Sequence, residues 1–183
     1  FVMLAEVFIF VPSVARFRED YLLARLERAQ IASLALEADD MISRDLEAEL
    51  LRNAEVYNVV LRRNEIRQLA LSSPIPSPIS ETFDLRNPSS MTLISDAMAT
   101  LLNTEERIIR VIGNPVRGGG LLIEVTMDEM PLRNALLAYG RNILLLSAFI
   151  SIITASLLFV AVQFLLVRPI KGVVTHMQAY AKS

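Results

Sequence analysis

Residues 142–167 read NILLLSAFISIITASLLFVAVQFLLV and contain no charged side chain over 26 positions. As an α-helix this run is about 39 Å long, at about 1.5 Å per residue, and the hydrocarbon core of a bilayer is about 30 Å thick. We therefore predict a transmembrane helix over 142–167. The run also explains why the 183-residue chain is 53% hydrophobic although 21% of its residues are charged.

The residue counts exclude several classes of protein. With no cysteine, six glycines and eight prolines, the chain is neither a disulfide scaffold nor a collagen-like sequence. With a single histidine and no cysteine, we expect no zinc or haem site. The three glycines at 118–120 lie between predicted strands and not at the start of a helix, so they do not predict a phosphate-binding loop. We expect no catalytic residue in this chain.

A second apolar run, FVMLAEVFIFVPSVA, occupies residues 1–15 and is interrupted only by Glu6. Because it starts at the first residue, we interpret 1–16 as the C-terminal part of a first transmembrane helix. Two alternatives remain open, a buried core element of a soluble domain and a signal peptide. A signal peptide is disfavoured because no basic segment precedes the apolar run.

The charges flanking the apolar runs predict a topology. Residues 168–183 carry three basic residues and no acid, whereas 17–141 carry 14 arginines and 19 acids, a balance of −5. The positive-inside rule then places the C-terminal end in the cytoplasm and 17–141 outside the membrane. The acidity of 17–141 argues against nucleic acid as a partner.

Helical composition and capping residues predict three helices between the apolar runs. They cover 14–38, 41–54 and 88–103, with Asp40 capping the second and Ser89 or Ser90 the third. A fourth helix begins after Asp128, has Pro131 in its first turn and continues into 142–167.

Four β-rich runs predict four strands in two hairpins. The first hairpin comprises 56–61 and 66–71, and the second comprises 107–113 and 121–127. SSPIPSPIS (72–80) is predicted to be an irregular connector because it contains three prolines. The predicted fold class is α+β: a small antiparallel sheet of two hairpins, with a long N-terminal helix and an exit helix that continue into the membrane helices.

Two stripes of residues indicate contacts with a partner helix. In the first helix the stripe has 3-4-3 spacing, and in 142–167 small residues recur every fourth position. The stripes are Val14, Phe17, Tyr21 and Ala24, and Ser147, Ser151 and Ala155. Together they predict a homodimer that forms through helices.

Arginine outnumbers lysine by 16 to 2, and four arginines of the middle segment are candidates for binding an anionic ligand. The guanidinium fork binds carboxylates and phosphates in two-point contacts. The candidates are Arg62, Arg67, Arg107 and Arg110. The alternative is that these arginines form surface ion pairs.

The segment VRPIKGVVTHMQAY (167–180) follows the second apolar run. Pro169 suits the first turn of a new helix, and Ile170, Val173 and Met177 share one face of that helix. The segment resembles the start of a HAMP domain, the four-helix relay of bacterial receptors. The resemblance implies that Pro169, Ile170, Val173 and Met177 relay a signal, and that His176 lies on a solvated face.

With this start of a HAMP domain, the order of segments resembles that of bacterial sensor histidine kinases. The segments are the end of a first membrane helix (1–16), a sensor domain similar to the PAS-like PDC or Cache type (17–141), a second membrane helix (142–167) and the HAMP start (168–183). PSVARFREDYL (12–22) and PLRNALLAYGRNILLLS (131–147) carry the same resemblance. The stimulus, whether small molecule, ion or protein, stays unidentified.

The resemblance implies a protein of the bacterial inner membrane, with 17–141 in the periplasm. It also implies a kinase core beyond residue 183 that uses ATP and Mg²⁺ and phosphorylates a response regulator. Two alternatives stay open. The chain is the front end of a chemoreceptor or a diguanylate cyclase, or it is a membrane-anchored protein that binds a partner and transmits nothing.

Overall fold

The computed structural model of the chain describes residues 2–38, 43–63, 66–116 and 120–167. The chain divides into two compact units, Phe1–Gly140 and Arg141–Ser183. The first unit contains three helices, a sheet and the beginning of a fourth helix within the described residues. This is an α+β fold, which confirms the predicted class.

Helix α1 (Val2–Ala38) runs without interruption from the first apolar segment into the polar region, as predicted. Pro12 lies inside it. Helix α2 (Arg44–Ala54) begins later than predicted, and its cap is Ser43, whose hydroxyl accepts a hydrogen bond from the Leu46 amide at 3.3 Å. The predicted cap Asp40 lies outside the described residues.

The sheet has five strands among the described residues, in the order β2-β1-β5-β4-β3. Their bounds are Asn58–Arg63 (β1), Ile66–Ser72 (β2), Ile79–Asp84 (β3), Ile108–Gly113 (β4) and Leu122–Asp128 (β5). Both predicted hairpins are present, since β1 pairs with β2 and β4 with β5 in antiparallel register.

Strand β3 corrects the prediction of a wholly antiparallel sheet. It pairs with β4 in parallel, so the sheet is mixed. The sequence ISETFD gives little strand signal, because it follows three prolines and contains only two apolar residues, Ile79 and Phe83. Only Phe83 of this strand is buried, which is the burial expected of a short edge strand.

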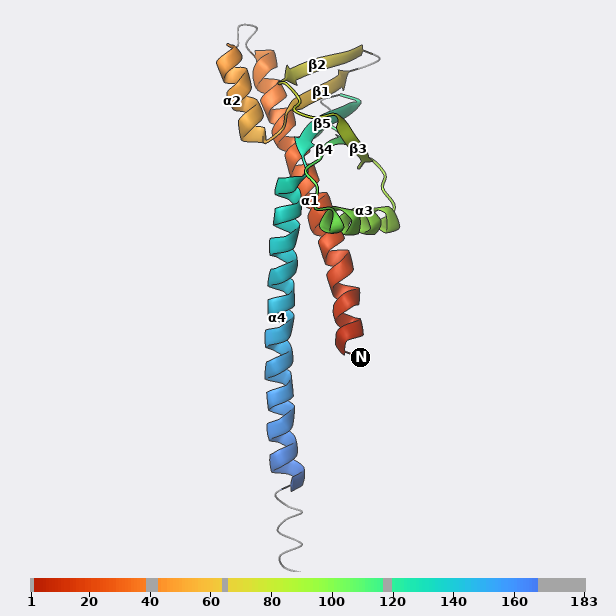
Figure 1. The fold of residues 1–183 in the computed structure, drawn as a ribbon, viewed down its shortest axis with the longest axis vertical. Coiled ribbons are helices and arrows are strands. Elements are labelled where there is room, and N and C mark those ends of the chain that lie inside the picture. The colour runs from red at the N-terminus through yellow and green to blue at the C-terminus, as the bar shows by residue number, and fades with distance from the viewer. Residues whose placement is uncertain (1, 39–42, 64–65, 117–119, 168–183) are drawn as a thin grey trace, which may run out of the picture. The chain divides into compact units, whose positions relative to one another are not determined.

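Helix α1 covers one face of the sheet, and α2 lies beside α1 (Figure 1). The core between them is formed by the alternate residues of the three central strands and by one stripe of α1. Its members from these strands are Val59, Leu61, Ile109, Val111, Ile123, Val125 and Met127, and those from α1 are Val14, Ala15, Leu22, Leu26, Ala29 and Ala32.

Helix α3 (Ser90–Leu102) packs against α1. Its cap is Ser89, one of the two predicted residues, whose hydroxyl accepts a hydrogen bond from the Thr92 amide at 3.1 Å. The helix lies near the middle of α1 (Figure 1), and its Thr100 accepts a hydrogen bond from Arg18 of α1.

Helix α4 (Met130–Val162) begins directly after the sheet, with Pro131 in its first turn as predicted. A π-helical turn, η2 (Gln163–Val167), follows it. The segment Met130–Leu165 is long and apolar enough to cross a membrane, and its most apolar part is not buried within the chain. Among the described residues α1 does not meet the same test, so the first membrane helix stays a prediction.

The N-terminal part of α1 packs against the N-terminal part of α4. Phe17 stacks on Tyr139 with ring centroids 4.2 Å apart, and a Cβ atom on Gly140 would lie 3.2 Å from the Phe10 ring. Of the stripe predicted to face a partner helix, Val14 is therefore in the core of its own chain and Phe17 has a partner there.

Candidate functional site

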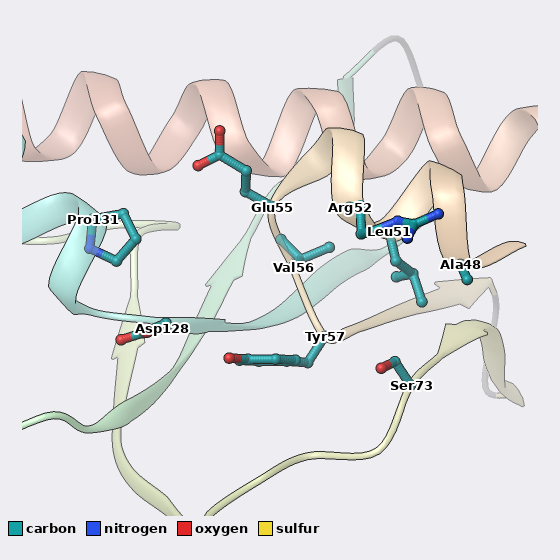
Figure 2. Close-up of a pocket in the computed structure, with 9 residues that line it drawn as sticks. All are labelled: Ala48, Leu51, Arg52, Glu55, Val56, Tyr57, Ser73, Asp128 and Pro131. Atoms are coloured by element: carbon teal, nitrogen blue, oxygen red, sulfur yellow. The ribbon is translucent and has the colours of Figure 1, made fainter.

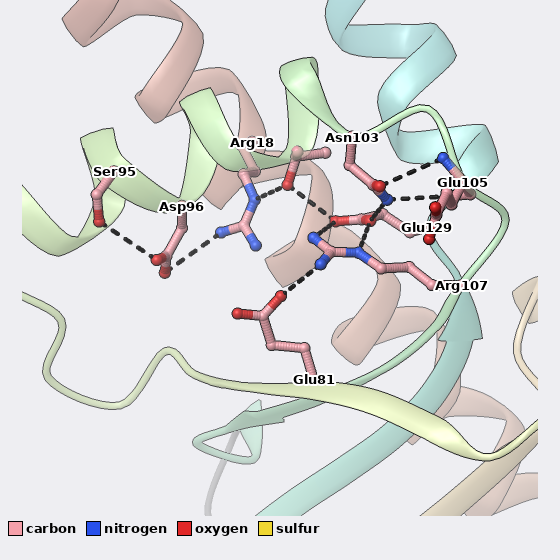
Figure 3. A network of polar contacts seen from close by, with 9 residues as sticks. Arg18, Glu81, Ser95, Asp96, Asn103, Glu105, Arg107 and Glu129 are labelled. Carbon is pink, nitrogen blue, oxygen red and sulfur yellow. Dashed lines mark hydrogen bonds and ion pairs between the residues drawn. The ribbon is translucent and has the colours of Figure 1, made fainter.

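The candidate site is a buried polar network around Glu129, the residue between the last strand and α4 (Figure 3). Glu129 is 1% exposed and accepts hydrogen bonds at both carboxylate oxygens. Thr100 Oγ1 donates to Oε1 at 3.0 Å, and Asn103 Nδ2 donates to Oε2 at 3.1 Å. Arg107 donates to both oxygens, with Nη2 at 3.0 Å from Oε1 and Nε bonded to Oε2.

Arg107 extends the network to the edge of the sheet. Its Nη1 forms an ion pair with Glu81 Oε2 of β3 at 2.8 Å. The backbone oxygen of Arg107 also accepts a hydrogen bond from the Glu129 amide at 3.1 Å. Arg107 is thus joined to Glu129 by both its side chain and its main chain, directly ahead of β4.

Arg18 brings α1 into the network. Its guanidinium is 1% exposed, Nε donates to Thr100 Oγ1 at 3.1 Å, and its Cζ lies 4.2 Å from the centroid of the Phe83 ring. Nη1 is 3.9 Å from Asp96 Oδ2, too far for a hydrogen bond, and neither Nη1 nor Nη2 has a hydrogen-bond partner. Thr100 therefore links Arg18 of α1 to Glu129.

The environment lowers the pKa of both buried groups, which favours the charged form of Glu129 and disfavours the charged form of Arg18. Burial raises the pKa of Glu129, but the hydrogen bonds from Arg107 and Thr100 outweigh this effect and hold the pKa below its usual value. Burial lowers the pKa of Arg18, and the nearby charges of Asp96 and Glu129 offset only part of that effect. Glu129 is therefore a stable anion, and Arg18 is a buried cation that is incompletely compensated.

These properties suit a structural connection between helices and strands more than a catalytic centre. A carboxylate held by four hydrogen bonds and excluded from water is a poor proton acceptor. The same bonds join α1, α3, the strand β4 and the start of α4, so a displacement of any one element changes bonds to the others. No cluster of three metal-ligating side chains occurs in the part of the chain that the structure describes.

Of the four predicted ligand-binding arginines, Arg107 lies in this network and already has two carboxylate partners. Arg110 lies in β4, half-buried, paired in register with Thr126 of β5. Arg62 is exposed in β1 and pairs in register with Leu122 of β5 and with Arg67 of β2.

The structure therefore does not bring the four arginines together. Along β5 the register runs from Leu122, beside Arg62, to Glu129, beside Arg107, which is roughly 23 Å at about 3.3 Å per residue. One small anion cannot contact both ends of that span. The predicted relay residues Pro169, Ile170, Val173 and Met177 lie outside the described residues.

The sequence reasoning missed Arg18, Thr100 and Glu129. A usable signal existed for Arg18, which shares a helix face with Val14 and Leu22, both fully buried. Because a charged side chain is normally assigned to solvent, Arg18 was not predicted to lie on the buried face of the helix. Thr100 and Glu129 carried no comparable signal because their pairing depends on residues 29 positions apart in the chain.

No family model, no curated protein and no solved structure matches this chain.

Proposed function

We propose that this chain is the sensing and transmembrane signalling portion of a bacterial sensor histidine kinase. In this proposal the α+β unit lies in the periplasm, α4 crosses the inner membrane, and the segment after it begins a HAMP domain. The protein acts as a homodimer in the bilayer. The kinase core uses ATP and Mg²⁺ and passes phosphate to a response regulator.

One observation carries the proposal: the network around Glu129 connects the folded unit to the first turn of a helix long and apolar enough to cross a membrane. An anchor that transmitted nothing would not need a buried charge network at that junction. Buried charges cost free energy, and specificity of arrangement is one role that can explain their retention.

The mechanism follows from the bonds that the network makes. In the proposed resting state, Thr100 joins Arg18 to Glu129 and so fixes α1 relative to the start of α4. A stimulus that binds one arrangement of the domain more tightly than another shifts the balance between them. The helix α4 then moves with its first turn, and the movement reaches the segment that follows it.

The test is phosphorylation of the full-length protein in membrane vesicles supplied with ATP and Mg²⁺. The proposal predicts incorporation of phosphate that is labile in acid and stable in base, as expected for phosphohistidine. Synthesis of a cyclic dinucleotide, or no incorporation of phosphate by the folded full-length protein, would contradict it.

A further inference from the structure

A cavity of about 450 Å³ lies at the junction between the sheet and α4 (Figure 2). This volume is within the range of small-molecule sites, roughly 300–1,000 Å³. The cavity is bounded by the end of α2, the residues that lead into β1, and the first turn of α4. Asp128 and Pro131 line it, and these residues flank Glu129 in the chain.

The cavity has charges of opposite sign at its two ends. Figure 2 shows Arg52 and Ser73 at one end and Asp128 and Pro131 at the other, with Val56 and Tyr57 between them. Val56 is 6% exposed, and Tyr57 presents its ring and hydroxyl to the cavity. A ligand that is apolar in the middle and charged at both ends matches this lining.

Glu55 also lines the cavity, but its charge is already compensated. Its carboxylate forms an ion pair with the buried Arg25 of α1. Its backbone adopts the left-handed conformation, with φ 54°, which L-residues other than glycine adopt at a cost. This conformation ends α2, where the Glu55 amide donates a hydrogen bond to the Arg52 carbonyl oxygen at 3.0 Å. Arg52 and Asp128, the other two charged residues of the lining, form no ion pair with any residue that the structure describes.

We infer that this cavity binds a small zwitterion, an ammonium and a carboxylate joined by a short apolar chain. The ammonium group bonds to the Asp128 carboxylate, whose Oδ1 also accepts the Met130 amide at 2.9 Å. The carboxylate group bonds to the Arg52 guanidinium. The apolar chain covers Val56 and the ring of Tyr57.

This inference deepens the proposed sensing function and rests on it for its biological meaning. Asp128 is the last residue of β5, and its side chain bonds the first amide of α4. A ligand at Asp128 therefore acts on the same helix start that the Glu129 network holds. Binding itself needs no kinase, so it can be measured independently of any signal.

The experiment is calorimetric titration of the full chain in lipid nanodiscs. The probes are the linear series from 3-aminopropanoate to 6-aminohexanoate, with pentylamine and pentanoate as ligands that carry one charge. At least one amino acid of the series is expected to bind tenfold or more tightly than either singly charged ligand. This difference is what one additional hydrogen-bonded charge provides.

Two variants locate the site. Asp128→Asn keeps an oxygen that can cap α4 but removes the charge, and Arg52→Gln removes the other charge. Each is expected to weaken binding of the zwitterion about tenfold or more. The control is Arg86→Gln, which removes an exposed arginine paired with Asp84 outside this cavity. Thermal unfolding of each variant verifies that it is folded.

Three results would overturn the inference: no binding by any member of the series, equal binding of the singly charged ligands, or binding unchanged in both folded variants. None of these results bears on whether the full-length protein incorporates phosphate. Conversely, phosphate incorporation without zwitterion binding would leave the proposed function in place and remove only this ligand site.

Discussion

At the scale of single residues, the junction combines one fully bonded charge with one that is not. Glu129 has four hydrogen bonds to its carboxylate, whereas the Nη1 and Nη2 atoms of Arg18 have none although the side chain is 1% exposed. Removing a group from a bonded buried pair is costly, while replacing an incompletely bonded charge by an apolar group often is not. The two residues therefore respond differently to substitution.

Glu129→Gln is expected to lower the free energy of unfolding by about 3 kcal/mol at pH 7, because Arg107 and Thr100 lose their charged acceptor. The effect depends on pH. Since the folded-state pKa of Glu129 is lowered, its stabilisation is complete above the ordinary glutamate pKa of about 4.3 and is lost as the pH falls through the folded-state value.

Thermal unfolding of the wild type and the variant between pH 7 and pH 3 measures this dependence. The wild type should lose more stability than Glu129→Gln on acidification. Asp84→Asn is the matched control, because Asp84 has an exposed partner, Arg86, and contributes little. Parallel curves for wild type and Glu129→Gln would show that Glu129 is not a stabilising anion.

Arg18→Met is expected to leave stability within about 1 kcal/mol of the wild type or to raise it. Methionine fills a similar volume over Phe83 and removes the cost of the two unpaired nitrogens, while Thr100 keeps its bond to Glu129. Urea unfolding monitored by circular dichroism is the measurement. A loss of 3 kcal/mol or more would mean that Arg18 is well compensated in the folded protein.

At the scale of elements, local patterns predicted most of the fold. Both hairpins, the cap of α3 at Ser89 and the start of α4 after Asp128 followed from capping residues and periodicity. Strand β3 did not, because its partner β4 lies more than 20 residues away and the pairing is parallel. The Glu129 network could not be predicted for the same reason, since long-range contacts leave no periodic pattern in a single sequence.

Gly113 of β4 lies close to α1. A Cβ atom on it would lie 2.4 Å from Leu26 Cδ1, and Leu26 is itself 3% exposed. Gly113→Ala should therefore destabilise the chain by about 1–3 kcal/mol. That loss corresponds to about 2–4 °C in Tm for each kcal/mol.

A double-mutant cycle with Leu26→Ala tests the cause. Leu26→Ala alone should cost about 2–5 kcal/mol because it opens a cavity in the core. In the double variant the methyl group at 113 fills part of that space. The stability lost by the double variant should therefore be smaller than the sum of the losses in the two single variants. Strict additivity would contradict the close approach of β4 to α1.

At the scale of the whole molecule, the charge distribution and the apolar segment predict an orientation. Residues 17–141 are net acidic, 168–183 are net basic, and Met130–Leu165 is long and apolar enough to cross a bilayer. The chain contains no cysteine, so single cysteines can report the side of the membrane without background.

Asn114→Cys lies in the exposed connection after β4. It should react with a membrane-impermeant maleimide added to bacterial cells whose outer membrane has been permeabilised and whose inner membrane is intact. Lys182→Cys should react only after the inner membrane is opened. The measurement is labelling before and after lysis. The reverse pattern would place the α+β unit in the cytoplasm and contradict the proposed sensing role.

The central claim is that the network around Glu129 couples the folded unit to α4. Its most direct test is the phosphorylation rate of the full-length protein in membranes carrying Glu129→Gln, beside Gly113→Ala, which destabilises the unit without touching the network. The account predicts that Glu129→Gln changes the rate at least fivefold, in the range of allosteric coupling energies, and that Gly113→Ala leaves it near the wild-type value. Equal rates for Glu129→Gln and the wild type would contradict the claim.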